Sequence, residues 1–182
     1  MQSLCDEERK AILELARQGV VEAVCHARPV HPIPHEGIFA RRCGVFVTLH
    51  VRGRLRGCIG VIEAREPLGE SLVRCAGSAA LEDPRFPPMR PEESSEVQIE
   101  VSLLSELQRI GPEEIEIGTH GLVVERGARR GLLLPQVAVE HHLGREEFLR
   151  ETCRKAGLPP DAWEDPATNV SGFTCEIVAQ GP

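Results

Sequence analysis

The sequence predicts an α+β fold, with a mostly antiparallel β-sheet flanked by helices and divided into two lobes with a cleft. Apolar and polar residues alternate over 45–61 and 97–103, which is typical of strands. Apolar residues recur at helical spacing between 3 and 28 and in the segment from 67 to 81. No segment repeats and none is of low complexity, so we expect residues 1–182 to form a single domain with two subdomains.

Composition and charge exclude several classes of protein. The chain is 41% hydrophobic and 27% charged, which is ordinary for a globular protein, and its net charge of -7 argues against a nonspecific nucleic-acid coat. The charged N-terminus and the lack of an apolar run of about 18 residues indicate no signal peptide or membrane span, so we expect a cytoplasmic protein. Seven cysteines without a CxxC pair indicate reduced thiols.

The first predicted helix begins near Ser3, a plausible cap, and ends near Arg28, before Pro29. Prolines at 29, 32 and 34 then exclude regular structure. Cysteines and histidines cluster in this region, which raises the question of a metal site: Cys25, His26, His31, His35 and Cys43. Because zinc sites usually present tight ligand pairs and the HPIPH segment lacks the helical spacing for one, we expect no metal and interpret the segment as a loop covering the hairpin that follows.

That hairpin, VFVTLHVRGRLRGCIGV at 45–61, is the most informative stretch of the chain. A three-residue loop at Arg52–Arg54 would give one consistently apolar face. The pairs that it produces are Val51 with Leu55, Leu49 with Gly57 and Val47 with Ile59. Arg56 and Cys58 would then lie on the opposite face, together with His50 and Thr48.

Cys58 allows two interpretations. In the first, Cys58 is a reactive or ligand-facing thiolate, because positive charge such as that of Arg56 lowers the pKa of a nearby thiol, and Gly57 and Gly60 let a substrate approach the backbone. In the second, Cys58 is a small buried residue in a tight sheet, as free cysteine often is. The arginines around the hairpin are likewise either a local basic patch or a solvated edge. They are Arg41, Arg42, Arg52, Arg54 and Arg56.

The segment from Pro67 to about Leu81 reads as a second helix, and EDPRFPP at 82–88 ends it. Its prolines fix an extended loop that holds Asp83, Arg85 and Phe86 in place. Asp83 and Arg85 either form an ion pair that stabilises the loop or face a pocket.

The rest of the chain continues the mixture of strands and helices. Glu100 lies on the polar face of the strand at 97–103, where it is either exposed or beside the hairpin. His120 begins a strand that includes 122–124, and either satisfies a local hydrogen bond or acts in acid–base chemistry or binding. A strand at 132–134, helices over 135–142 and from 145 towards the cap at Gly157, and a closing strand over 173–177 follow.

Several of these segments resemble one known family. LRGCIG at 55–60 is similar to the hallmark of the AMMECR domain, and EDPRFPP (82–88), EVQIEVSLLS (96–105), GTHGLVV (118–124), LLLPQVAVE (132–140) and CRKAGL (153–158) extend the match. The resemblance implies that the LRGCIG segment lines a site near EDPRFPP. It also implies an association of prokaryotic members with Memo-like and radical-SAM proteins, and a role in modifying a nucleotide or nucleic acid.

Three hypotheses on function follow. In the first, the protein is an enzyme or enzyme component, with Cys58 as nucleophile or substrate ligand and His120 or Glu100 as proton-transfer group. Substrate-binding residues would be Arg56, Gly57, Gly60, Asp83, Arg85 and Phe86. In the second, the domain is a binding module or scaffold for a partner protein. In the third, the motif is architectural and Cys58 fills a gap. No motif for a cofactor is evident, nor is a phosphate loop or a dinucleotide fingerprint.

Overall fold

A computed structural model describes residues 4–25, 32–63 and 65–180, and divides the chain into two compact units. The first unit takes in the chain up to Leu104 together with the end from Glu176 onward, and the second unit runs from Ser105 to Cys175. Both combine helices with antiparallel strands, which confirms the predicted α+β class.

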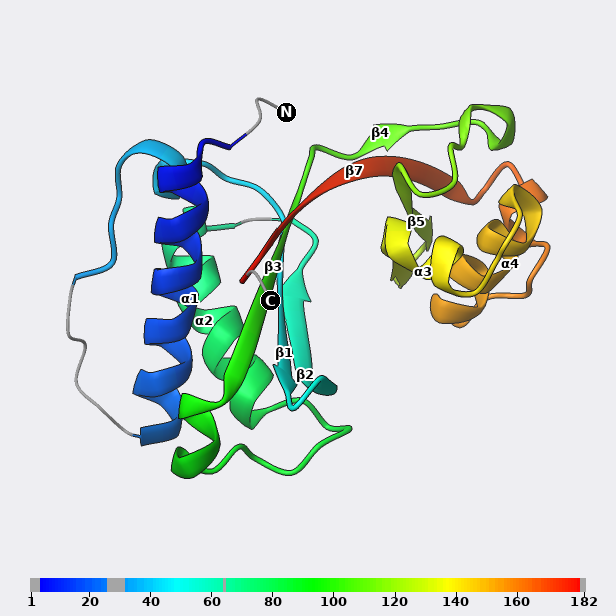
Figure 1. The fold of residues 1–182 in the computed structure, drawn as a ribbon. Coiled ribbons are helices and arrows are strands. Elements are labelled where there is room, and N and C mark those ends of the chain that lie inside the picture. The colour runs from blue at the N-terminus through cyan, green and yellow to red at the C-terminus, as the bar shows by residue number, and fades with distance from the viewer. Residues whose placement is uncertain (1–3, 26–31, 64, 181–182) are drawn as a thin grey trace. The chain divides into compact units, whose positions relative to one another are not determined.

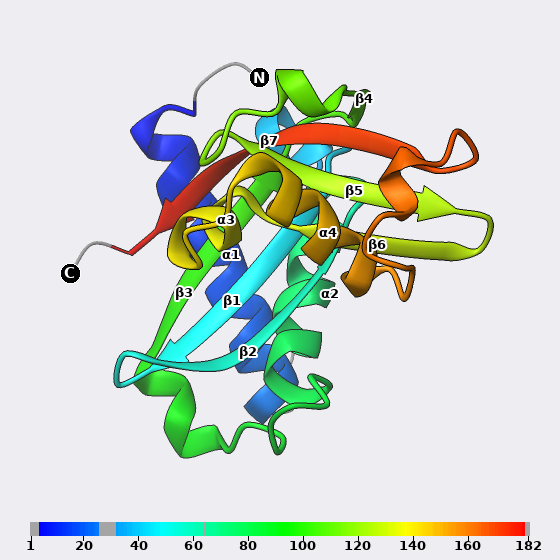
Figure 2. The ribbon, with the colours of Figure 1, turned by 90° about the vertical axis from the view of Figure 1, so that its right-hand side faces the viewer.

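The first unit is a three-stranded antiparallel sheet covered on one face by two helices (Figures 1 and 2). The strands are β1 (Val45–Val51), β2 (Arg54–Val61) and β3 (Val97–Leu104), with β1 in the centre. The helices are α1 (Asp6–Cys25) and α2 (Leu68–Leu81), which lie side by side. Two short 3-10 helices complete the unit, η1 (Gly37–Ala40) and η2 (Pro91–Ser95).

The alternation of side chains along β1 decides which face of this sheet is buried. Val45, Val47 and Leu49 are fully buried and belong to the same core as Ile12 of α1 and Leu72 of α2. Since successive side chains of a strand point to opposite faces, Phe46, Thr48 and His50 lie on the face away from the helices. The periodicity of 45–51 therefore leaves one face of the sheet opposite the core, and this face carries the polar side chains Thr48 and His50 beside Phe46.

The turn of the hairpin differs from the prediction. Arg52 and Gly53 form a two-residue turn, both with positive φ (52° and 72°), and Val51 pairs with Arg54 rather than with Leu55. A two-residue turn of this kind matches the twist of the strands. An irregularity in β2 then restores the predicted pairs Leu49–Gly57 and Val47–Ile59, and it leaves Arg56 as the extra residue of a bulge. The predicted three-residue loop was wrong, whereas the predicted pairing beyond it is confirmed.

The second unit is built around β5 (His120–Arg126), which lies between β6 (Arg129–Leu133) and β7 (Asn169–Ala179). The last residues of β7, from Glu176 onward, belong to the first unit. The two-residue strand β4 (Gln108–Arg109) pairs with β7 and was not predicted. The helices are α3 (Pro135–Glu140) and α4 (Arg145–Lys155), with the 3-10 helices η3 (Pro112–Glu114) and η4 (Ala162–Glu164). Phe148 and Leu149 of α4 pack into a core with Leu122 of β5.

The predicted elements are otherwise found close to their expected bounds. The first helix ends at Cys25 rather than near Arg28, and its proposed cap Ser3 lies outside the described residues, as do His26 and His31. Within the ranges that the structure describes, no helix has the length and the apolar character needed to cross a membrane.

Candidate functional site

Cys58 lies in the middle of β2, on the sheet face turned away from the helices. It pairs with Thr48 of β1, which in turn pairs with Glu100 of β3, so the three residues form one row across the sheet. The Thr48 hydroxyl donates a hydrogen bond to the sulfur of Cys58 at 3.2 Å. Cys58 is half-buried, and the row therefore presents a thiol that is positioned by its neighbour and partly open to solvent.

Asp83 joins the EDPRFPP loop to this strand. Its side chain is only 2% exposed, and its Oδ2 accepts a hydrogen bond from the backbone N–H of Cys58 at 2.8 Å. Arg85 donates to the same carboxylate from its backbone N (3.1 Å), from Nε (3.0 Å) and from Nη2 (2.7 Å). The guanidinium of Arg85, helped by the backbone donors, holds the pKa of Asp83 well below its usual range despite the burial. Asp83 is thus a buried anion with two ordered neighbours, Cys58 and Arg85.

Arg85 is the exposed member of this cluster. Its side chain is 54% exposed, and its guanidinium carbon lies 5.4 Å from the ring centroid of Phe86, a cation–π distance. The hydrogen bond to Asp83 is the main cause that raises the pKa of Arg85, and the thiol of Cys58 adds to the effect. The cation therefore lies beside the thiol and is still open on its outer side, where an anionic group can bind.

Arg56 binds the C-terminal end of the same loop. Its guanidinium donates to both carboxylate oxygens of Glu93 in η2, at 2.9 and 3.2 Å, and to the carbonyl of Pro87 at 2.8 Å. The side chain is only 14% exposed, and Arg56 is the main cause that lowers the pKa of Glu93. Asp83 and Arg56 thus attach both ends of the loop to β2.

The two glycines that flank Cys58 make close contacts. A Cβ on Gly57 would lie 2.0 Å from the backbone oxygen of Ala79 in α2, and one on Gly60 would lie 2.3 Å from the ring of Phe46. Glycine is needed at both positions because a helix backbone and an aromatic ring occupy the space of a side chain. Substrate contact by these glycines stays a prediction.

The other two predicted site residues lie farther from the thiol or in the second unit. Glu100 is half-buried and is separated from Cys58 by Thr48. His120, the first residue of β5, belongs to the second unit, and its Nδ1 accepts the backbone N–H of Glu116 at 3.1 Å. Within the first unit the structure brings together four predicted residues, Arg56, Cys58, Asp83 and Arg85, with Phe86 beside them.

Two neighbours of the site were not among the predicted site residues. Thr48 was placed on the correct face by the alternation of β1, but nothing in its sequence context marks a hydroxyl as a partner of the thiol. Glu93 follows a proline in a short 3-10 helix, and only the fold shows that its carboxylate meets Arg56.

Comparisons with known proteins identify the family of the chain. The model of the family described as AMMECR1 matches residues 13–178. The chain belongs to the AMMECR1 family. A relative from Methanothermobacter thermautotrophicus is 44% identical over 96% of this chain and 95% of its own length, and one from Thermococcus gammatolerans is 46% identical over 97% and 92%. The crystal structure of protein PH0010 from Pyrococcus horikoshii is similar with a TM-score of 0.88 and 41% identity, covering 96% of this chain and 92% of that one.

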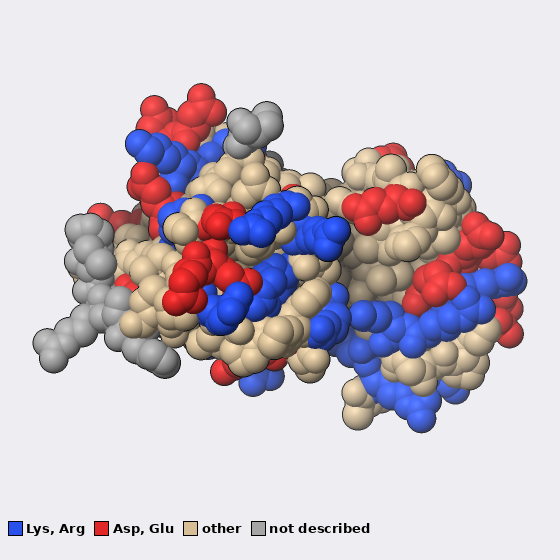
Figure 3. Space-filling model, turned by 60° about the horizontal axis from the view of Figure 1, so that its bottom comes forward, with Lys and Arg blue, Asp and Glu red and all other residues tan. Residues whose placement is uncertain are grey.

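In this AMMECR1-family chain, carboxylates and carbonyls accept hydrogen bonds from several of the hairpin arginines. Arg52 pairs with Glu96 at 2.9 Å, Arg56 pairs with Glu93, and Arg42 donates to the carbonyl of Arg65. Figure 3 shows basic and acidic side chains next to one another on the face that it presents. This arrangement disfavours a basic patch around the hairpin, because carboxylates pair with Arg52 and Arg56; Arg52 is exposed, whereas Arg56 is largely buried.

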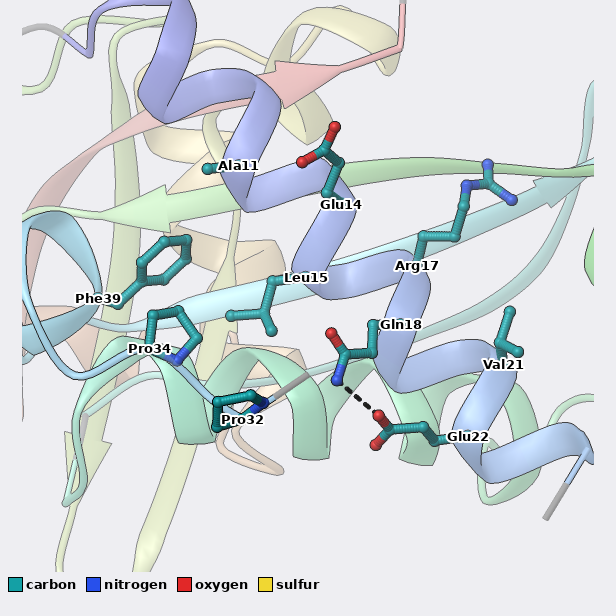
Figure 4. Close-up of a pocket in the computed structure, with 10 residues that line it drawn as sticks. All are labelled: Ala11, Glu14, Leu15, Arg17, Gln18, Val21, Glu22, Pro32, Pro34 and Phe39. Carbon is teal, nitrogen blue, oxygen red and sulfur yellow. Dashed lines mark hydrogen bonds between the residues drawn. The ribbon is translucent and has the colours of Figure 1, made fainter. Parts of the chain in front are cut away.

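A groove in the first unit lies between α1 and the segment that leads from Pro32 to η1 (Figure 4). Its volume is about 550 Å³, and Leu15, Pro34 and Phe39 line its apolar floor, while Gln18 and Glu22 are hydrogen-bonded at its edge. None of the predicted site residues lines this groove. Among the described residues, no group of three or more His, Cys, Asp or Glu side chains is arranged to hold a metal ion.

Proposed function

We propose that this chain is an enzyme component in which the thiol of Cys58 reacts with, or directly holds, a substrate whose anionic group binds to Arg85. One observation carries the proposal: a single buried carboxylate, Asp83, fixes both the backbone of Cys58 and an exposed guanidinium beside it. A positioned thiol next to a cation is the environment in which cysteine nucleophiles are found.

Each neighbour has a role in this proposal. Thr48 donates a hydrogen bond to the sulfur and so holds the thiol in place. Glu100, next in the row, is the proton-transfer group of this site. Arg56 acts as a positioning residue, because its guanidinium is already bound to Glu93 and Pro87. Phe86 offers the substrate an apolar surface beside Arg85.

The proposal includes the partners and the reaction class that the family resemblance implies. Memo-like and radical-SAM proteins would act together with this chain, and a nucleotide or nucleic acid would supply the anionic group for Arg85 through a phosphate. A guanidinium with one open side suits such a group, because arginine binds phosphate through paired N–H donors.

The test is to purify the chain together with a Memo-like and a radical-SAM protein and to incubate the mixture with S-adenosylmethionine and a nucleotide pool. Mass spectrometry of the tryptic peptides then looks for a covalent adduct at Cys58, and mass spectrometry of the nucleotide pool looks for a changed nucleotide. We expect both to be lost in Cys58→Ala, and to be strongly reduced in Arg85→Gln but not in the exposed control Asp161→Asn. Turnover that survives in Cys58→Ala would refute the role of the thiol.

A binding module is the second candidate, and one observation favours it. The proline-fixed loop presents Arg85 and Phe86 on a rigid support, which lowers the entropic cost of docking a partner. If Cys58→Ala binds the Memo-like protein as tightly as the wild type, Arg85→Gln does not, and no turnover accompanies binding, this second function replaces the first.

A further inference from the structure

The second unit contains a cavity of about 470 Å³, separate from the Cys58 site. It lies between the end of β4, the 3-10 helices η3 and η4, and the start of β7. A cavity of this volume is within the range of pockets for small organic ligands. Its walls include the flat or apolar side chains of Pro112, Trp163, Pro166 and Val170.

Two residues that line this cavity carry buried polar atoms without a hydrogen-bond partner. They are Nε1 of Trp163 and Oγ1 of Thr168, and Thr168 as a whole is only 5% exposed. Buried polar groups are nearly always paired, because each unpaired one destabilises the fold. The indole N–H can only donate, and the hydroxyl can also donate, so a ligand that satisfies both must offer acceptor atoms.

The charged groups around the cavity indicate the charge of that ligand. The carboxylates of Glu114, Glu164 and Asp165 line it, against the single guanidinium of Arg109. Asp165 is already paired with Arg126 at 2.8 Å. Even with Arg126 counted beside Arg109, the three carboxylates outnumber the guanidiniums, and this excess of negative charge disfavours an anionic ligand. Carboxylates at the wall can instead accept hydrogen bonds from N–H groups of a ligand.

We propose that this cavity binds a flat, uncharged nitrogen heterocycle that carries acceptor and donor atoms side by side, as in a ring carboxamide or a nucleobase. Its acceptor atoms take the hydrogens of Trp163 and Thr168, its N–H groups donate to a carboxylate at the wall, and its ring lies against the prolines and the indole. The site is independent of the proposed function, since all of its residues belong to the second unit.

Intrinsic fluorescence tests this proposal in the full chain, because Trp163 is the only tryptophan and the chain has no tyrosine. The probes are nicotinamide, cytosine and adenine, and the matched control is nicotinate, which replaces the carboxamide with a carboxylate on the same ring. We expect a saturable change in the emission of Trp163 and a raised melting temperature with at least one uncharged probe, and no saturable change with nicotinate. No change with any uncharged probe, or equal binding of nicotinate, would overturn the proposal.

A pair of variants separates ligand binding from a structural role of the hydroxyl. Thr168→Val keeps the shape and removes the hydroxyl, so we expect it to weaken binding about tenfold, the equivalent of one hydrogen bond. Thr168→Ser keeps the hydroxyl and should bind within a few-fold of the wild type. Unchanged binding in Thr168→Val, or equal losses in both variants, would show that the hydroxyl does not contact the ligand and would refute this geometry.

Discussion

Replacing Asp83 by asparagine removes the charge of the group that joins the EDPRFPP loop to Cys58. Oδ1 accepts the backbone N–H and Nε of Arg85, and Oδ2 accepts the N–H of Cys58 and Nη2 of Arg85. An asparagine keeps only one of these two oxygens, so two of the four bonds are lost and its NH₂ group faces other donors. With about 1.5–3 kcal/mol for a bond to a charged group, discounted because Arg85 is half-exposed, we expect the free energy of unfolding to fall by about 2–4 kcal/mol.

Urea unfolding at neutral pH measures this loss, with Asp161→Asn as the exposed control, for which we expect a change within about 0.5 kcal/mol. The pKa of Asp83 is lowered in the fold, so its contribution is fully present above the unfolded value of about 3.9 and is lost as the pH falls through the folded value. The difference between wild type and variant should therefore stay constant down to about pH 4 and narrow below it. A loss under about 1 kcal/mol, or a difference that widens in acid, would refute the reasoning.

Three further predictions concern the same unit. Gly57→Ala should lower the free energy of unfolding in urea by about 3 kcal/mol or more, since the added Cβ would lie 2.0 Å from a backbone oxygen of α2. In the control Gly127→Ala the added Cβ has no atom within 4 Å, so we expect only the roughly 1–2 kcal/mol cost of a left-handed residue. Equal losses in the two variants would contradict this reasoning. Arg56→Lys should cost about 1–2 kcal/mol in the same assay because it loses the paired contact with Glu93, and a neutral result would contradict that role. Burial raises the pKa of Cys75 to about 11, so iodoacetamide followed by mass spectrometry should label it only after unfolding, and labelling of the native protein would contradict its burial.

The periodicity of the chain was sufficient for much of the first unit. Alternation over 45–51 assigned Thr48 to one face and Val47 to the other, because side chains of a strand alternate with a period of two. The predicted pairing of Val47 with Ile59 then placed Cys58 on the face of Thr48. Helical spacing likewise located α2 within a residue of its observed bounds. Such patterns reflect which side chains are buried, so they predict the buried faces of strands and helices well.

The turn and the contacts of the site required the folded chain. Arg52 takes positive φ, which a side chain disfavours and which asparagine would have signalled, so the two-residue turn and the bulge at Arg56 were missed. The contact of Asp83 with the backbone of Cys58 joins residues 25 apart in the sequence and depends on the path of a proline-rich loop. No local pattern encodes a contact of this kind.

The most direct test of the Cys58 site is the rate at which iodoacetamide labels Cys58 in the native protein, followed peptide by peptide in wild type and in Arg85→Gln. The cation beside a half-buried thiol predicts labelling of Cys58 before any unfolding, and a several-fold slower rate in Arg85→Gln. Two results would contradict a reactive thiol: labelling of Cys58 only after denaturation, as expected for buried Cys75, or an equal labelling rate in the two proteins. Either result would leave LRGCIG as part of a binding surface.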